Sequence, residues 1–184
     1  VTRIRPDDGA ARRALGDALL KTDNPTAAAD SFRAALKIDG DDKRALLGLG
    51  QALNAQREST DASEYLERAL RIDDQFGLAY AALGVTYKNL GRLERAGEVL
   101  RHATRLDPKE PGTHMALGLH SLEQGDKRDA EECFRAVLEL TPNNAAAHFE
   151  LGRLRIEDER VDDGIESMKT AVKLDPAVFE YQLG

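Results

Sequence analysis

The stretch LGVTYKNLGRLERAGEVLRHATRLDP, residues 83–108, decides the fold of this 184-residue chain. It opens on a Leu-Gly pair, passes a Gly-Arg break and closes on Asp-Pro. The Leu-Gly pair recurs along the whole chain at a constant interval of 34 residues. Its glycines are Gly16, Gly50, Gly84, Gly118 and Gly152. A fixed period of this length indicates an array of repeated units, each packed on its neighbours, rather than one globular core.

Each period holds two predicted helices. Twelve residues after the glycine comes a small residue, and four residues later comes a large apolar one. Further spacings of three follow, and together they place these side chains on one face of an α-helix. The large apolar residues are Phe32, Leu66, Leu100, Phe134 and Met168. Turn-forming residues such as Gly91 and Arg92 separate this helix from the earlier one, which holds the Leu-Gly pair, so each period predicts a helix–turn–helix unit.

The repeated glycine needs a physical reason, because glycine inside a helix costs about 1 kcal/mol relative to alanine. We expect the glycine to let the second helix approach closely at that helix's small residue. The small residues are Ala28, Ala62, Ala96, Ala130 and Gly164. Since Gly164 replaces the alanine of the other units, we expect the fifth pair of helices to pack less tightly.

With Leu-Gly, then an aromatic or apolar residue, then Ala, Phe or Leu, Ala and Pro, the pattern resembles the tetratricopeptide repeat. The resemblance implies an all-α fold, a right-handed α-solenoid of helix–turn–helix repeats. The predicted repeats span residues 9–42, 43–76, 77–110, 111–144 and 145–178. Residues 1–8 match the end of a preceding repeat or an N-terminal extension, and residues 179–184 match the start of a further helix or a tail. Neither end of the array has the polar residues of a capping repeat. We therefore expect that the chain is part of a longer array or that a neighbouring molecule covers its ends.

In the family that the chain resembles, the first helices line a concave groove that holds peptides or partner helices. The same positions here give an apolar strip flanked by polar side chains, as is typical of interaction surfaces. The predicted groove residues are Leu47, Gln51, Leu78, Ala81, Val85, Lys88, Met115, Leu119, Leu122, Phe149 and Arg153. We expect a protein or peptide partner with an apolar or amphipathic segment. The alternative is that some of these residues are core, buried between adjacent first helices.

Two polar binding modes of the family do not fit the sequence. The carboxylate clamp needs Lys and Asn at the fifth and ninth positions of a repeat, where the first unit has Arg13 and Asp17. The asparagine ladder needs Asn at the sixth position of successive repeats. The chain has Ala14, Gly48, Ala82, Ala116 and Glu150 there. The groove is therefore predicted to bind through apolar contacts.

The charge balance argues against nucleic acid as a partner. The net charge is −7, and it is uneven: residues 1–110 carry 18 basic and 18 acidic residues, whereas residues 111–184 carry 8 and 15. Phosphate neutralisation requires a basic surface that this chain lacks. No run of 18 apolar residues occurs, so we expect no direct insertion into a membrane.

Residues able to do chemistry are few and scattered. His114 and His148 occupy the position where the family has an aromatic residue, which favours packing, and no spacing fits a metal site. Cys133, the only cysteine, follows two glutamates that would raise its pKa, so it is no nucleophile. Glu131 and Arg135 are predicted to pair on an exposed helix face. We expect no catalytic residue, no metal and no cofactor.

The sequence therefore predicts a non-catalytic scaffold or adaptor that binds a partner protein in an apolar groove. One alternative is homo-oligomeric assembly through the open ends of the array, and another is a targeting array excised from a larger enzyme. The start Val1–Arg5 does not resemble a signal peptide, and a single cysteine suits a reducing compartment. We expect the cytoplasm, or the periplasm if an upstream signal has been removed.

Overall fold

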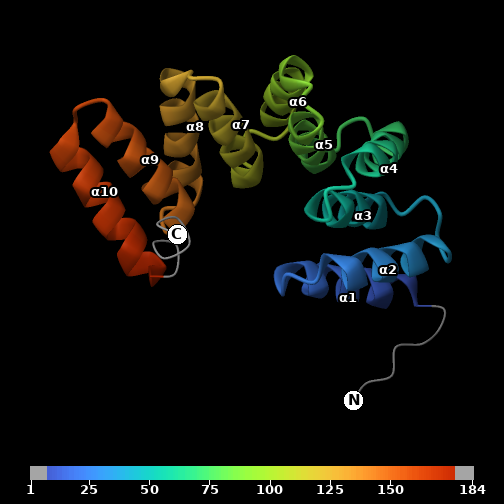
Figure 1. Cartoon of the computed structure of the whole chain (residues 1–184). Helices are drawn as coiled ribbons and strands as arrows, with labels where there is room; N and C mark the ends of the chain where they lie inside the picture. The colour runs from blue at the N-terminus through green and yellow to red at the C-terminus, as the bar shows by residue number, and fades with distance from the viewer. Residues whose placement is uncertain (1–7, 177–184) are drawn as a thin grey trace. The chain divides into compact units, whose positions relative to one another are not determined.

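The computed structural model describes residues 8–176, and every regular element in that range is an α-helix (Figure 1). The predicted all-α array of helix pairs is confirmed. The helices are α1 (Gly9–Lys21), α2 (Pro25–Leu36), α3 (Lys43–Ala55), α4 (Ser59–Ile72), α5 (Gly77–Asn89), α6 (Leu93–Leu106), α7 (Pro111–Glu123), α8 (Lys127–Leu140), α9 (Ala145–Glu157) and α10 (Val161–Leu174). The elements predicted for residues 1–7 and 179–184 lie outside the described residues.

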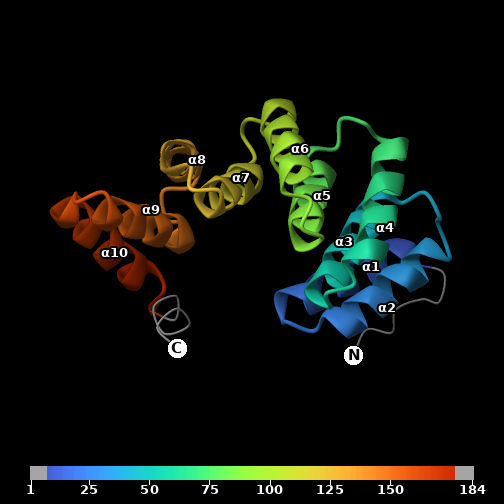
Figure 2. The ribbon, with the colours of Figure 1, turned by 45° about the horizontal axis from the view of Figure 1, so that its top comes forward.

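The chain forms two compact units, residues 1–106 and residues 107–184. In unit 1, helices α1 to α6 pack as three consecutive pairs, and α1, α3 and α5 also contact one another in sequence. In unit 2, α7 packs on α8, α8 on α9, and α9 on α10. Figures 1 and 2 both show the two helices of each pair side by side.

Short polar side chains start most of the first helices. Asp8, Asp42 and Asn144 each precede a first helix, and their side-chain oxygens accept hydrogen bonds from backbone N–H groups of the first turn. Before α7, Glu110 accepts a hydrogen bond from the N–H of Gly112. Since the first N–H groups of a helix have no partner inside it, these caps fix where four of the five pairs begin, whereas Phe76 before α5 offers no such cap.

All five pairs turn through the same unusual backbone conformation. The fifteenth residue counted from the start of each first helix has a positive φ, between 54° and 80°. These residues are Asp23, Arg57, Gly91, Gly125 and Glu159. Glycine adopts this left-handed conformation freely, whereas in other residues it brings Cβ too close to the backbone. Two turns are therefore relaxed, and three are strained.

The constant spacing of the Leu-Gly pair has a different cause from the one predicted. A Cβ added at Gly16 would lie 2.7 Å from the ring of Phe32, and one at Gly50 would lie 2.6 Å from Cγ of Leu66. The nearest neighbour is thus the large apolar residue of the second helix, and the prediction that it is the small residue was wrong in these pairs. The glycine makes room for a side chain that fills the space between the helices.

The fifth pair differs, and here the prediction of looser packing was wrong. A Cβ added at Gly152 would lie 2.9 Å from the carbonyl oxygen of Gly164, and one at Gly164 would lie 2.8 Å from that of Gly152. Helices α9 and α10 therefore approach backbone to backbone. Gly164 is the residue that permits this approach, because any Cβ would push the helices apart.

In unit 1 one aromatic side chain connects two pairs. Phe32 of α2 is completely buried, and its ring occupies the space that a Cβ would need at Gly16 of α1 and at Gly48 of α3. The buried cluster around it continues through Leu49 and Leu53. The core of unit 1 thus runs from each pair to the next, as expected for an array.

Candidate functional site

The predicted groove residues of unit 1 gather mainly on α5. Leu78, Ala81, Val85 and Lys88 recur there at intervals of three and four residues, so they share one face of the helix. Leu78 is 40% exposed and Val85 is 37% exposed, so both side chains offer apolar area at the surface. Ala81, in contrast, is buried. This face of α5 is an exposed apolar patch with Lys88, half-buried, at its end.

Helix α3 contributes differently from the prediction. Gln51 is exposed, but Leu47 is only 8% exposed and belongs to a buried cluster with Leu46 and Leu66. Leu47 therefore supports the surface from below, as core, and offers little area to a ligand. The amide of Asn54 also joins α3 to α5, because it donates a hydrogen bond of 2.7 Å to the hydroxyl of Thr86.

Ion pairs hold the first helices of unit 1 in place. Arg13 of α1 pairs with Asp42, the cap of α3, and Lys43 of α3 pairs with Asp73 before α5. Burial alone would raise the pKa of Asp42, but the backbone N–H of Ala45 and the Arg13 guanidinium lower it below its ordinary value. The hydrogen bond from Lys43 lowers the pKa of Asp73 in the same way. Both carboxylates are stabilised in the charged form.

In unit 2 the structure brings three predicted residues together in a hollow of about 440 Å³ on α7 and α9. Leu119 and Leu122 come from α7, and Arg153 comes from α9. Both leucines are half-buried and pack on the unit's core, so the apolar floor is fixed in place. Glutamates complete the lining of the hollow: Glu123, Glu150 and Glu157.

The register of the repeat places all three glutamates at groove positions, on the same first helices as the predicted residues. They were left out of the predicted groove residues because that set was chosen mainly for apolar character. Glu150 is 8% exposed and accepts a hydrogen bond of 3.0 Å from Arg153. Glu157 lies 3.4 Å from the ammonium of Lys127. The lining of the hollow therefore has an apolar part, Leu119 and Leu122, hereafter its floor, and a charged part, hereafter its rim, which is mainly acidic.

The remaining predicted residues of unit 2 lie beneath this surface. Phe149 is 7% exposed. Met115 is half-buried and packs on the cluster that contains Phe134 and Leu151. Both residues shape the site from below, in agreement with the alternative that part of the predicted strip is core.

A cluster of charged residues holds α8 to the turn before α10. Arg160 donates two hydrogen bonds, of 3.0 and 2.7 Å, to the carboxylate of Glu131. Arg135 lies 2.7 Å and Arg155 3.8 Å from the same carboxylate. Hydrogen bonding from Arg160 lowers the pKa of Glu131 below its ordinary value. The predicted pair of Glu131 and Arg135 exists, but Glu131 is mostly buried rather than part of an exposed face.

The histidines and the cysteine play structural roles. The Nε2 of His114 donates to the carbonyl of Pro108 at 2.9 Å, and His148 makes the same bond to Pro142. Each histidine thus fastens the loop that precedes its helix. Cys133 is buried, and burial together with Asp129 raises its pKa to about 11. A thiol with so high a pKa is protonated at neutral pH and is a poor nucleophile.

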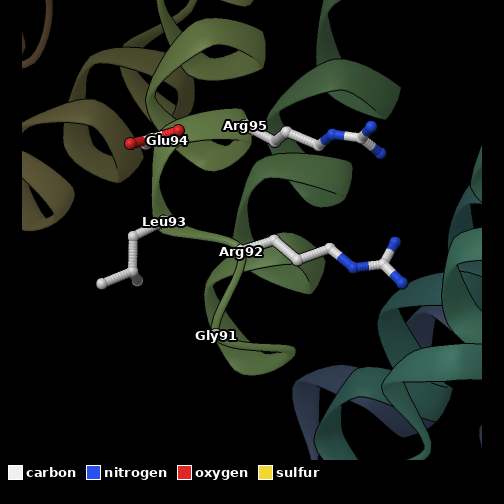
Figure 3. Close-up of a pocket in the computed structure, with 5 residues that line it drawn as sticks. All are labelled: Gly91, Arg92, Leu93, Glu94 and Arg95. Carbon is white, nitrogen blue, oxygen red and sulfur yellow. The ribbon is translucent and has the colours of Figure 1, made fainter.

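Further hollows were not predicted. One, of about 680 Å³, lies at the turn between α5 and α6, where the side chains of Arg92 and Arg95 extend in the same direction and Leu93 points away from them (Figure 3). The guanidinium of Arg92 lies 5.9 Å from the centre of the Tyr87 ring. Another hollow, of about 440 Å³, lies on α10 and is lined by Ile165, Met168, Lys169, Val172 and Lys173.

Between residues 8 and 176, no helix is long and apolar enough to cross a membrane. Within the same described range, no group of three or more His, Cys, Asp or Glu side chains is placed to hold a metal ion.

Sequence comparison identifies the family of the chain. One model of the tetratricopeptide repeat matches residues 2–43, 13–76 and 115–178, and a second model of the same repeat matches residues 78–110. The chain belongs to the tetratricopeptide repeat family. Proteins of this family generally mediate protein–protein interaction, and the helix pairs described above are its repeats. No curated protein matches this tetratricopeptide chain by sequence comparison.

Solved structures with the same fold include those of three proteins. TTC0263 of Thermus thermophilus is 22% identical, with a TM-score of 0.85 and 95% of each chain covered. PilF of Pseudomonas aeruginosa is 24% identical, with a TM-score of 0.77, and the match covers 92% of this chain and 78% of that one. YrrB, described as having an unusual peptide-binding site, is 22% identical, with a TM-score of 0.60 and coverage of 92% and 88%.

Proposed function

We propose that this tetratricopeptide protein is a non-catalytic scaffold that binds a segment of a partner protein on its first helices. The observation that carries the proposal is the hollow on α7 and α9, where Leu119 and Leu122 form an apolar floor inside a charged rim. In a concave site, apolar side chains contribute contact area and placed polar groups fix the orientation of a ligand. The peptide-binding site ascribed to YrrB, a protein of the same fold, agrees with this use of the repeat.

The exposed face of α5 gives unit 1 a second surface of the same kind. Leu78 and Val85 expose apolar area there beside Gln51 and Lys88. Each unit thus offers a binding surface on its first helices, built from large apolar side chains that its own core leaves uncovered. An amphipathic helix or an apolar stretch of a partner chain would cover such a surface through contacts at helical spacing.

A capture experiment tests the proposal. The wild-type chain, a Leu119→Gln/Leu122→Gln variant and a Leu93→Gln/Leu140→Gln control would be immobilised and exposed to lysate of the source organism. The control leucines are each 39% exposed and do not line the hollow, so the control makes the same chemical change elsewhere. We expect a protein captured by the wild type and by the control but lost by the first variant. Equal capture by all three chains would overturn the proposed site.

Self-assembly is a second candidate function, favoured by the apolar stripe on α10. Ile165 is 41% exposed and Val172 is 37% exposed on one face of that helix, beside Met168. Light scattering at two protein concentrations would show a rising mass if this stripe joins copies of the chain. An Ile165→Glu/Val172→Glu variant should then stay at the monomer mass, and a constant mass in the wild type would rule the candidate out.

A further inference from the structure

We infer that the hollow on α7 and α9 selects a basic amphipathic segment, one that carries Lys or Arg beside leucine-sized apolar side chains. The inference rests on the proposed function and adds the chemistry of the ligand to it. Two properties of the hollow support it: an excess of acidic side chains in its lining, and two leucines that pack on the core of unit 2.

The rim of the hollow carries an excess of negative charge. Its lining contains the carboxylates of Glu123, Glu150 and Glu157 and one cation, Arg153. The guanidinium of Arg153 forms an ion pair with the carboxylate of Glu150, 3.0 Å away. Lys127, at the edge, is shared between Glu157 at 3.4 Å and Asp158 at 3.2 Å. The residues that line the hollow therefore sum to a negative charge, which a ligand that brings Lys or Arg would offset.

The acidic and apolar residues of the hollow lie on the same two helices. Arg153 pairs with Glu150 and Lys127 pairs with Glu157, and the side chains of Glu123 and Glu157 are exposed where they line the hollow. Leu119 and Leu122 pack on the cluster around Phe134 from below. A ligand that covers the leucines also displaces water from the rim, and charge pairs strengthen when water is excluded. Apolar and basic groups on one segment would therefore bind cooperatively.

The net charge of the surrounding sequence also favours a basic ligand. Residues 111–184 contain 15 acidic and 8 basic residues, and such an imbalance attracts cations from solution and raises their rate of association. The corresponding surface of unit 1 has no such excess of acidic side chains, because none of its predicted residues is acidic. The preference for a basic segment is therefore specific to the hollow of unit 2.

Selection from a random peptide library tests the inference and does not require the partner to be identified first. A phage-displayed library of peptides of about 16 residues, long enough for a helix of about 24 Å, would be selected on the whole chain. The enriched peptides would be synthesised, and their affinities would be measured by fluorescence anisotropy. The panel contains the wild type, Glu123→Gln/Glu157→Gln, and a Glu139→Gln/Glu166→Gln control with the same change of charge on exposed positions of α8 and α10.

We expect the enriched peptides to combine Lys or Arg with Leu, Ile or Phe at helical spacing. Their affinity should fall about fivefold in Glu123→Gln/Glu157→Gln, as expected for two exposed charge pairs, and stay unchanged in the control. It should also fall between about 0.05 M and about 0.5 M NaCl, because salt screens such pairs.

The other outcomes separate the two proposals. The enriched peptides could instead be neutral or acidic, with an affinity that depends on Leu119 and Leu122 but not on Glu123 and Glu157. That result would overturn the preference for basic peptides but not the binding site. If no enriched peptide loses affinity in Leu119→Gln/Leu122→Gln, both the binding site and its preference are wrong.

Discussion

Units 1 and 2 are built from the same helix pair, but the residues that hold neighbouring pairs together differ. In unit 1, the buried ring of Phe32 reaches from one pair into the next, and single ion pairs such as Arg13–Asp42 also join successive pairs. In unit 2, a buried cluster around Phe134 lies beside a charged one, in which three arginines share the carboxylate of Glu131. The comparison teaches that the repeat fixes the packing within a pair, whereas the contacts between pairs vary. The charged contacts of unit 2 are concentrated on one carboxylate, whereas those of unit 1 are spread over separate ion pairs.

The largest effect is expected where backbones touch. Gly164→Ala should lower the free energy of unfolding of unit 2 by about 2–3 kcal/mol, because its Cβ would meet Ile156 at 2.5 Å and the Gly152 carbonyl at 2.8 Å. Gly84→Ala in unit 1 should cost only about 1 kcal/mol, since the nearest atoms there belong to the movable side chain of Leu100. Guanidinium denaturation followed by circular dichroism measures both, and equal losses would contradict the distinction.

A smaller loss is expected from the charged cluster. Glu131→Gln should destabilise unit 2 by about 2 kcal/mol, because three guanidinium groups lose their shared carboxylate. The matched control in unit 1 is Asp41→Asn, whose side chain is 79% exposed and pairs with Arg68 at 3.2 Å. It should change stability by less than about 0.5 kcal/mol. Denaturation in low and high salt gives the measurement. A control as costly as Glu131→Gln would show that burial is not what matters.

The turns inside the pairs give effects of about 1 kcal/mol with opposite signs. Arg57→Gly and Glu159→Gly should stabilise, since glycine removes the strain of a positive φ. Gly91→Ala and Gly125→Ala should destabilise by a similar amount, although a Cβ there meets no atom within 4 Å. Arg57→Ala serves as the control and should change little, because it keeps the strain. A melting temperature unchanged by Arg57→Gly would refute this account.

The smallest effect concerns pH. The pKa of Glu131 lies below its ordinary value in the folded protein, so its stabilising contribution is complete above the unfolded pKa of about 4.3 and is lost as pH falls through the folded pKa. The pKa of Lys127 is raised by Asp158, so its contribution is lost only in alkali above about 10.4. Stability should be flat between about pH 6 and 9, and Glu131→Gln should show a shallower acid loss than the wild type. An identical acid profile would contradict this role.

The sequence was sufficient for the fold because the fold is local. The Leu-Gly pair and the large apolar residue after it lie within one period, so their spacing predicts the helix pair directly. The site depends on contacts that the spacing does not contain. The register found Leu119, Leu122 and Arg153, but apolar character was a poor guide to exposure, since Leu47 and Phe149 are buried. Exposure depends on how neighbouring pairs pack.

Two other features were hidden for physical reasons. Glycine in a turn indicates a left-handed conformation at Gly91 and Gly125. Arg57 and Glu159 have the same conformation, but their residue types rarely adopt it, so the sequence does not indicate it. Arg135 lies four residues from Glu131 and was predicted, but Arg155 and Arg160 come from up to 29 residues away, and no local pattern links them to Glu131.

The ring of Phe32 constrains how the array can be rearranged during evolution. Because it fills the space beside both Gly16 and Gly48, the first repeat can be followed only by a repeat that has glycine at the facing position. The next repeat has Ala82 there, which packs with the smaller Leu66. If recombination joined the first repeat directly to the third, the methyl group of Ala82 would collide with the ring. The repeats are therefore alike in fold but not interchangeable in order, and duplication of one must be accompanied by a change in its neighbour.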